Sequence, residues 1–251
     1  MVDGVYLVVT DYELEIIYRD SSYIAINKPS GLLVHKSMID RHEIYFAMKI
    51  LRDQIGQWVY PVHRLDKPTS GVLLFALDTE SARLMSEEFK AKKIQKKYLA
   101  IVRGYIQEEG FIDHPLSVKL DKIADKKASD KEAEEAQTSF KRLSKVELNH
   151  AVGRYDKTRY SLVELSPKTG RKHQLRRHMK HLSHHILGDT KYGRGEHNKM
   201  VREYYNCHRL MLHAKSLEFF HPYTKKRILL QADTDETWDV FKNLFSYFED
   251  V

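Results

Sequence analysis

One carboxylate between two cations is the residue of this sequence best placed to do chemistry. Asp66 lies between an arginine and a lysine in the segment Pro61–Leu77, and Pro68 and Gly71 restrict the chain that follows it. Flanking cations favour the ionised carboxylate, which can act as a nucleophile when it is held at the edge of a strand. From local chemistry alone, the commoner role of such a residue is to cap a turn or to pair with Arg64.

A strongly basic segment, Tyr160–Gly193, is the second candidate. A helix is predicted over Arg171–Leu182, with three apolar residues at helical spacing on one face. The remaining faces carry Arg171, Lys172, Arg176, Arg177 and Lys180. Cations near a helix N-terminus oppose the macrodipole by about 0.3–1 kcal/mol each, so this charge has another use. Phosphate groups or a buried carboxylate are the functional alternatives, and a solvated basic face is the structural one.

Six histidines in and after this segment raise the question of a metal site. They are His173, His178, His181, His184, His185 and His197. The sequence has no HExxH pattern and one cysteine, Cys207, and no carboxylate lies between Arg171 and Gly188. A zinc site needs about four ligands, or three and a water, so we expect no metal. The sequence also lacks the glycine-rich motifs that bind nucleotides, so we expect no nucleotide cofactor.

The elements that must position these residues are mostly strands. Short β-type runs predict a hairpin near the N-terminus, single strands in the middle of the chain and a second hairpin near its end. In order, these runs are Glu15–Asp20, Tyr23–Asn27, Gly71–Leu77, Lys97–Arg103, Arg159–Leu165, Leu210–Phe220 and Arg227–Ala232. Hairpins with scattered helices predict an α+β fold with a mixed, mainly antiparallel sheet and flanking helices.

Two further helices are predicted from capping and periodicity. Asp78 can cap a helix that runs to about Lys92, and its inner face is Leu84, Met85 and Phe89. A C-terminal helix carries an aromatic stripe that we interpret as core packing: Trp238, Phe241, Leu244, Phe245 and Phe248.

Composition limits the class of protein. The chain has 251 residues, 42% of them hydrophobic, so it should fold, and we expect one domain over residues 1–251. A net charge of +7 favours polyanionic partners. A single cysteine, an acidic N-terminus and the lack of a membrane-spanning apolar run predict a cytoplasmic protein with no membrane partner. Residues 121–135 are nearly all charged or small and predict a solvated loop or surface insertion, or an arm that becomes ordered on RNA.

Three blocks of the sequence together resemble the RluA family of pseudouridine synthases. The blocks are Ile26–His35 (INKPSGLLVH), His63–Leu74 (HRLDKPTSGVLL) and Gly170–Gly193 (GRKHQLRRHMKHLSHHILGDTKYG). They stand in the family's order, and the resemblance extends over roughly residues 14–232. It is greatest to a branch that has no RNA-binding domain ahead of the catalytic domain. The resemblance implies the pseudouridine synthase fold with a central active-site cleft.

The resemblance also implies roles for particular residues. Asp66 matches the catalytic aspartate, Tyr98 the tyrosine that stacks on the target base, and Arg176 the basic residue that pairs with the aspartate. Arg64 matches the arginine that helps to flip the target nucleotide. Leu175 and Ile186 are expected as apolar pocket walls. The predicted RNA contacts are Arg64, Arg171, Lys172, Arg177, Lys28 and His35.

The expected activity is the isomerisation of uridine to pseudouridine in RNA. The reaction moves uracil from N1 to C5 on the same ribose, so it needs no redox cofactor and no metal. The aspartate can start it by attacking C1′, by adding to the ring or by taking a proton from the sugar. The nearest branch modifies uridine 65 of tRNA, in the stem below the T-loop. The alternatives are a ribosomal RNA substrate and an RNA-binding protein without catalysis. A monomer is expected.

Overall fold

All the strands of the described chain join one large, mostly antiparallel sheet. The computed structural model describes residues 13–35, 45–117 and 132–245. Its strands are β1 (Ile16–Arg19), β2 (Tyr23–Lys28), β3 (Tyr60–Pro61), β4 (Ser70–Ala76), β5 (Gln95–Arg103), β6 (Glu109–Asp113), β7 (Gln137–Leu148), β8 (Thr158–Pro167), β9 (Leu212–Phe220) and β10 (Arg227–Gln231). Their order in space is β1-β2-β4-β9-β5-β8-β7-β6, with β3 beside β4 and β10 beside β9. Only β4 and β9 pair in parallel among these strands.

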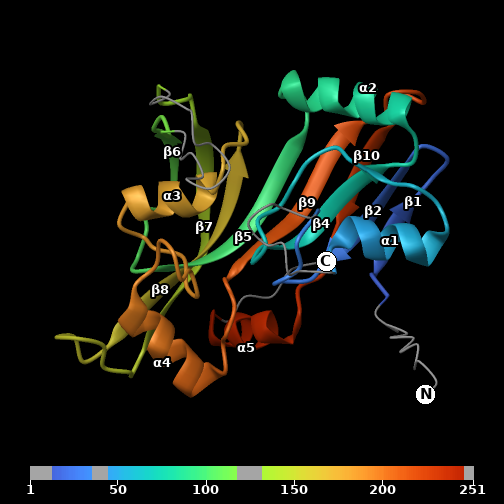
Figure 1. The fold of residues 1–251 in the computed structure, drawn as a ribbon. Coiled ribbons are helices and arrows are strands. Elements are labelled where there is room, and N and C mark those ends of the chain that lie inside the picture. The colour runs from blue at the N-terminus through green and yellow to red at the C-terminus, as the bar shows by residue number, and fades with distance from the viewer. Residues whose placement is uncertain (1–12, 36–44, 118–131, 246–251) are drawn as a thin grey trace, which may run out of the picture.

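Five helices flank the sheet of the described chain. They are α1 (Ala47–Ile55), α2 (Thr79–Lys90), α3 (Gln174–His181), α4 (Gly195–Tyr205) and α5 (Glu236–Phe245). Figure 1 shows α2 across one end of the central strands and α5 near the other end. The mainly antiparallel sheet with flanking helices confirms the predicted α+β fold. None of the helices in the described ranges combines the length and apolar character that a bilayer crossing requires.

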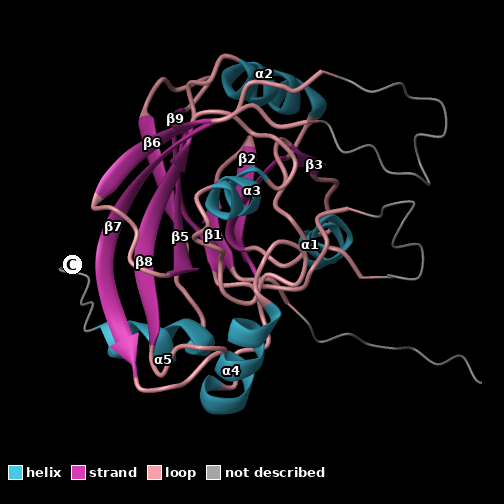
Figure 2. Cartoon of the chain, turned by 90° about the vertical axis from the view of Figure 1, so that its left-hand side faces the viewer, coloured by secondary structure: helices cyan, strands magenta, loops and turns pink. Residues whose placement is uncertain are grey.

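The strands at the centre of the sheet are buried on both faces. Alternate residues of a strand point to opposite faces, so β4 supplies Leu73 and Phe75 to one core and Val72 and Leu74 to another. The first face is covered by α1 and, over β5 and β8, by α3. The second face is covered by α2 and α5. Figure 2 shows α1 and α3 on the same side of the curved strands β7 and β8.

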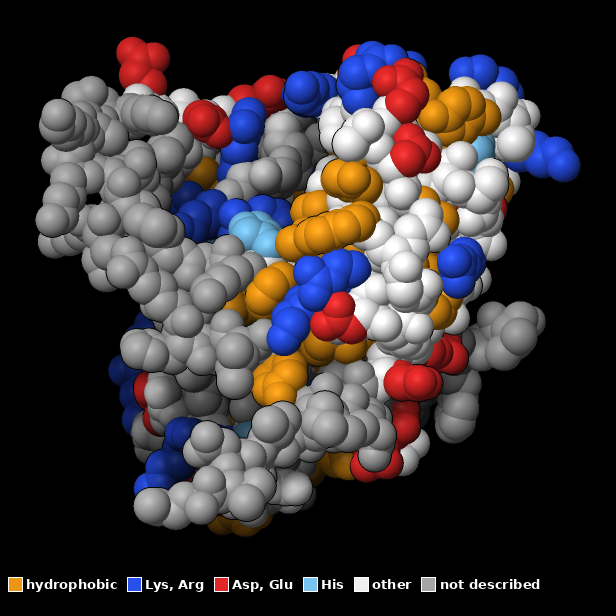
Figure 3. Space-filling view, turned by 45° about the vertical axis from the view of Figure 1, so that its right-hand side comes forward, with side chains coloured by type: hydrophobic (Ala, Val, Ile, Leu, Met, Phe, Trp, Pro, Cys, Tyr) orange, Lys and Arg blue, Asp and Glu red, His pale blue; other side chains and the backbone are white. Residues whose placement is uncertain are grey.

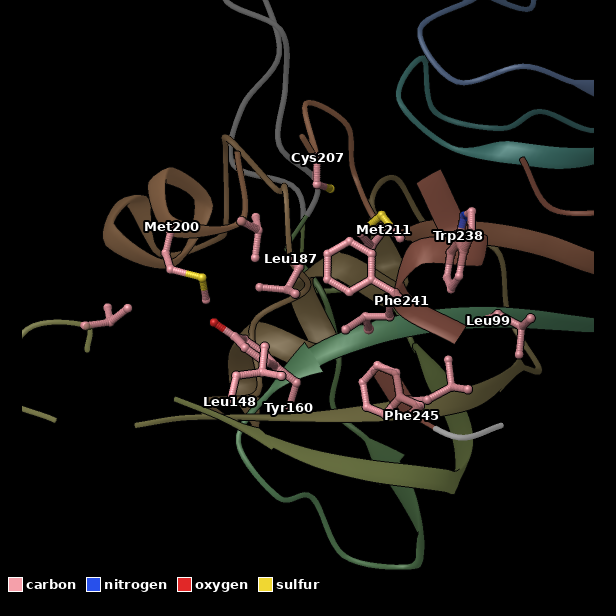
Figure 4. Close-up of a cluster of buried hydrophobic side chains, with 14 residues drawn as sticks. Leu99, Leu148, Tyr160, Leu187, Met200, Cys207, Met211, Trp238, Phe241 and Phe245 are labelled. Carbon is pink, nitrogen blue, oxygen red and sulfur yellow. The ribbon is translucent and has the colours of Figure 1, made fainter. Parts of the chain in front are cut away.

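The two helices predicted from capping and aromatic spacing are both present. Asp78 accepts a hydrogen bond from the Ser81 amide at the start of α2, and Met85 is fully buried beneath the helix. In α5, Trp238, Phe241 and Phe245 pack with residues of β5, β8 and α4 in one core cluster. Figure 4 shows these rings pointing into the cluster. The aromatic stripe is core packing as predicted, and Phe248 lies outside the described residues.

Several elements of the fold were not predicted from the sequence. They are α1, α4, β3, β6 and β7. The predicted basic helix begins three residues late, at Gln174, because His173 adopts a left-handed conformation with φ of 56°. Most of the charged segment 121–135 lies outside the described residues. Its described end joins the fold, since Glu134 forms a backbone bridge with Leu116.

Gly71 makes the only parallel junction of the described sheet possible. It pairs with Ala214 where β4 meets β9, and its φ is 107°, which side-chain-bearing residues rarely adopt. A Cβ at this position would lie 2.2 Å from the carbonyl oxygen of Ala214. The absence of a side chain therefore brings β9 against the strand that follows the Asp66 loop.

We predict that Gly71→Ala lowers the free energy of unfolding by about 3 kcal/mol, because overpacking and a positive φ act together. Urea denaturation monitored by circular dichroism measures the loss. Gly195→Ala is the matched control, since a Cβ at Gly195 meets nothing within 4 Å. A Gly71→Ala variant as stable as the control would mean that β4 and β9 can separate without penalty.

Candidate active site

Backbone and side-chain hydrogen bonds hold the loop that carries Asp66, between β3 and β4. The Thr69 amide donates to the Asp66 carbonyl at 3.0 Å, which closes a turn around the aspartate. The ammonium of Lys28 is fully buried and donates to the carbonyls of Pro29, Leu32 and Lys67. Lys28 therefore fastens the turn after β2 to the Asp66 loop. This position does not fit the RNA contact predicted for Lys28, because its charge faces the protein interior.

His63 anchors the other side of the same loop. Its Nε2 accepts a hydrogen bond from the Leu74 amide at 3.0 Å, and its ring stacks on Phe89 with a centroid distance of 5.1 Å. Burial, reinforced by the charge of Lys96, lowers the pKa of His63 to about 3. The ring is therefore neutral at physiological pH, as an acceptor of a backbone N–H must be. His63 thus links the loop to both β4 and α2.

Asp66 faces Arg176 across the interior of the protein. The two residues are 110 positions apart, and Arg176 Nη1 lies 3.3 Å from Asp66 Oδ2. The Asp66 side chain is 19% exposed, whereas that of Arg176 is only 6% exposed. The carboxylate thus meets solvent while the guanidinium below it is almost sealed. His173 Nε2 lies 3.8 Å from the second carboxylate oxygen, Asp66 Oδ1.

A second carboxylate holds Arg176 in this position. Asp189 accepts two hydrogen bonds of 2.8 Å from Arg176, one from Nε and one from Nη2. Asp189 also accepts from the amides of Lys191 and Tyr192, and the Tyr192 ring lies 5.2 Å from the guanidinium carbon. Burial alone would raise the pKa of Asp189, but the hydrogen bonds and charge of Arg176 hold it below its usual range. Asp189 therefore remains ionised and neutralises Arg176, which leaves Nη1 for Asp66.

Tyr98 projects from β5 into the same space. Burial and the negative charge of Asp66 both raise the pKa of its hydroxyl, so the phenol stays protonated. The ring also packs against apolar residues on the cavity face of the sheet. A flat, neutral aromatic surface thus faces the aspartate.

These residues line a cavity of about 680 Å³. This volume lies in the range of pockets that enclose a small ligand, and one nucleotide fits that class. Among the described residues, the lining includes Asp66 as its one carboxylate and eight cations. The cations are Arg64, Lys90, Lys92, Lys96, Lys168, Arg171, Lys172 and Arg176. In Figure 3, Lys and Arg side chains and a histidine gather in a hollow of the surface. The charge of the cavity suits a polyanion.

The structure brings the predicted catalytic residues together in the cavity, but it places only some of the predicted RNA contacts there. The predicted residues that line the cavity are Asp66, Tyr98, Arg176, Arg64, Arg171, Lys172 and Leu175. Arg177 lies outside the lining and donates to the carbonyl and hydroxyl of Ser117. His35 is half-buried and outside the lining, and burial and the charge of Arg64 lower its pKa. Ile186 packs in the core behind α3 and is not a pocket wall.

Sequence reasoning missed three residues of the site. Asp189 and Tyr192 belong to the GDTKYG end of the third block, but no role was drawn from them. A buried arginine requires a carboxylate, and the first acidic residue after Arg176 is Asp189, which was an available signal. Lys96 immediately precedes the predicted strand Lys97–Arg103, and no role was predicted for it. Its spacing of two from Tyr98 places both side chains on the same face of β5.

The histidines of the basic segment have structural partners. His178 bonds to the hydroxyl of Thr138 and the carbonyl of His114. His197 bonds to the hydroxyl of Tyr160 and accepts from Arg103. Within the described ranges, no three His, Cys, Asp or Glu side chains form a group that could hold a metal ion.

We predict that Asp189→Asn lowers the free energy of unfolding at pH 7 by about 3 kcal/mol, because it strips a buried arginine of its counter-ion. The folded-state pKa of Asp189 is depressed. Its contribution is therefore complete above the unfolded pKa of about 4 and is lost as pH falls through the folded pKa. Urea denaturation from pH 7 to pH 2.5 should show the gap between the two proteins closing below about pH 4. A difference in unfolding free energy that does not change with pH would mean that the charge of Asp189 does not stabilise the protein.

Comparison with known proteins identifies the family. The family model for RNA pseudouridylate synthases matches residues 22–181. A protein of Haemophilus ducreyi named tRNA pseudouridine synthase C is 59% identical over 235 residues, which cover 94% of this chain and 97% of that protein. A Vibrio parahaemolyticus protein of the same name is 55% identical over 94% of this chain and 96% of its own length.

Solved structures agree with the fold. Human RNA pseudouridylate synthase domain containing 4 is 26% identical, with a TM-score of 0.68 over 92% of this chain and 93% of its own. The domain containing 1 protein has a TM-score of 0.65 at the same identity, over 88% of this chain and 84% of its own. With an aspartate, an arginine and a tyrosine meeting in a basic cavity, these matches confirm the family predicted from the three sequence blocks. This chain belongs to the RNA pseudouridylate synthase family and is a pseudouridine synthase.

Proposed function

We propose that this enzyme isomerises uridine to pseudouridine in tRNA, at uridine 65 in the stem below the T-loop, with Asp66 as the catalytic carboxylate. The observation that carries the proposal is the Asp66 carboxylate, which is paired with Arg176 and partly open to a basic cavity of about 680 Å³. Relatives that cover nearly the whole chain are named for tRNA, and this supports the choice of RNA. A single buried cysteine, Cys207, fits an enzyme of the cytoplasm.

The reaction rearranges one nucleotide. The N1–C1′ bond breaks, the uracil turns, and a C5–C1′ bond forms. The proton on C5 leaves and N1 gains a proton, so the atoms and electrons balance within the substrate and water. The base must remain in the enzyme while it is detached, and stacking on Tyr98 within the cavity helps to retain it. Asp66 is the one carboxylate of the described cavity lining that can begin this sequence.

The ion pair keeps Asp66 ready for this step. Partial burial destabilises a charged carboxylate, and an opposite charge at close range offsets the effect. Arg176 provides that charge at 3.3 Å from Asp66 Oδ2. Because Asp189 holds Arg176 by two other nitrogens, Arg176 need not move when Asp66 reacts. The enzyme thereby presents a charged group in a fixed position.

A uridine in a stem must leave the base stack before it can reach Asp66. Flipping costs a few kcal/mol, and stacking on an aromatic ring returns about 1–3 kcal/mol. Tyr98 supplies that ring, and Arg64 at the exposed rim of the cavity is positioned to replace the base or hold the backbone. Folded RNA is recognised mainly through its shape and its phosphates, which suits a cavity rimmed by cations.

The proposed substrate can be tested in cells and with purified protein. Pseudouridine is mapped in total RNA from cells with and without the gene, and we expect the signal at position 65 of tRNA to disappear. A tRNA transcript with cytidine at position 65 is the matched control for the purified enzyme. Loss of a ribosomal RNA signal in place of the tRNA signal would overturn the proposed substrate.

We predict that Asp66→Asn abolishes product and leaves the Kd for tRNA within about twofold of wild type. The amide keeps the shape of the side chain and removes the charge that the chemistry needs. Release of tritium from [5-³H]uridine tRNA measures turnover, and filter binding measures affinity. Turnover within tenfold of wild type would exclude Asp66 from the mechanism.

We predict that Arg171→Ala weakens tRNA binding and reduces its salt dependence, because Arg171 lies on the cavity rim and RNA phosphate can replace its surface partner Glu134. The loss of one phosphate contact lowers the slope of log Kd against log salt by about 0.7–0.9. Arg227→Ala is the control, since Arg227 is also exposed and paired with a glutamate but does not line the cavity. Equal slopes for the two variants would contradict a phosphate contact at Arg171.

A further inference from the structure

Lys96 is a cation in the cavity that the chemistry described above does not use. It lies on β5 two residues before Tyr98, so both side chains project from the same face into the cavity. Its ammonium makes one long hydrogen bond, 3.5 Å to the carbonyl of Thr169. Among the described residues, no carboxylate lies within 4.0 Å of it. Lys96 is half-buried and therefore has unused donors at a position only partly open to water.

The charged form of Lys96 is disfavoured in the free protein. Burial lowers the pKa of Lys96, and no neighbouring negative charge opposes the effect. A half-buried cation without a counter-ion is less favourable than a paired one such as the arginine beside Asp66, which has two carboxylates. The lining around Lys96 also includes Lys90, Lys92 and Lys168, whose positive charges attract an anion to the same place. The position is thus unsatisfied until an anion arrives.

We propose that the Lys96 ammonium binds a backbone phosphate of the RNA when the target uridine enters the cavity. The inference rests on the proposed function, since it takes RNA as the substrate. A phosphate restores the missing counter-charge, which the neutral carbonyls of uracil cannot do. With Tyr98 stacked on the base from the same strand, one short stretch of β5 holds both the base and the backbone of the flipped nucleotide. Lys96 is a substrate-binding residue in this scheme, and the bond changes remain with Asp66.

Lys97 offers a matched control in the next position of the strand. It points away from the cavity lining and pairs with Glu164 at 3.0 Å, with its side chain 52% exposed. Replacing either lysine by methionine removes one charge and keeps most of the unbranched side chain. The two variants therefore have the same net charge and differ in whether the lost cation faces the cavity.

The decisive measurement is the Kd for tRNA across a range of salt concentrations, with Asp66→Asn as the parent protein so that no product forms. We expect Lys96→Met to weaken binding at low salt by about tenfold or more, and to lower the slope of log Kd against log salt by roughly 0.7–0.9. Lys97→Met should leave both values at the parent level. An unchanged slope in Lys96→Met would overturn the phosphate contact, even if affinity fell.

The stability of the free protein is a second measurement. A phosphate-binding role and a purely structural role for Lys96 predict opposite changes in it. We expect Lys96→Met to raise the urea midpoint of the free protein, because it removes a half-buried charge without a counter-ion. A lower urea midpoint in both Lys96→Met and Lys96→Gln would mean that Lys96 stabilises the fold through its hydrogen bond to Thr169. That result would overturn the proposal. Neither readout requires turnover. A wild-type enzyme that binds tRNA but forms no pseudouridine in it would therefore count against the proposed function alone.

Discussion

The structure depends on one guanidinium that two carboxylates share. Arg176 is bound on one side by the buried Asp189 and on the other by Asp66, which meets the cavity. Asp189 compensates the burial of the arginine, and the guanidinium, which stays charged, also attracts the carboxylate of Asp66. The surrounding elements serve this arrangement: α3 carries the arginine, the turn after it carries Asp189, and Lys28 and His63 hold the Asp66 loop. The carboxylate that we propose as catalytic is thereby held beside a fixed positive charge.

Local sequence signals were sufficient for most of the frame. Runs of apolar and β-branched residues predicted β2, β4, β5, β8 and β9, and Asp78 predicted the start of α2. The helices α1 and α4 were missed, and each lacks a side-chain hydrogen bond at its N-cap. The strand β7 was missed because half-buried and exposed residues interrupt its alternation. Its place in the sheet comes from pairing with β8, which a local pattern does not contain.

The site was predictable only in part. Nothing near Asp66 in the sequence reveals that its partner is Arg176, and local chemistry favoured a pair with Arg64. The family resemblance supplied that partner, and the geometry agrees with it. The resemblance did not reveal that Lys28 binds backbone carbonyls inside the protein or that Lys96 lines the cavity. A lysine that binds carbonyls and a lysine that faces a cavity look alike in sequence. Burial separates the two, and burial is a property of the folded chain.

The parallel junction of the sheet has a consequence for how activity is lost. Backbone pairing across it is limited to Ser70 with His213 and Gly71 with Ala214. Asp66 comes from the β1–β4 side of this seam, whereas Tyr98 and Arg176 come from the other side. The two clusters beside α5 and α3 lie wholly on the β9 side of the seam, whereas the clusters beneath α1 and α2 include residues of both sides. A small slippage along the seam would therefore separate Asp66 from Tyr98 and Arg176 and leave the first two clusters intact. Heat inactivation should then precede the loss of secondary structure.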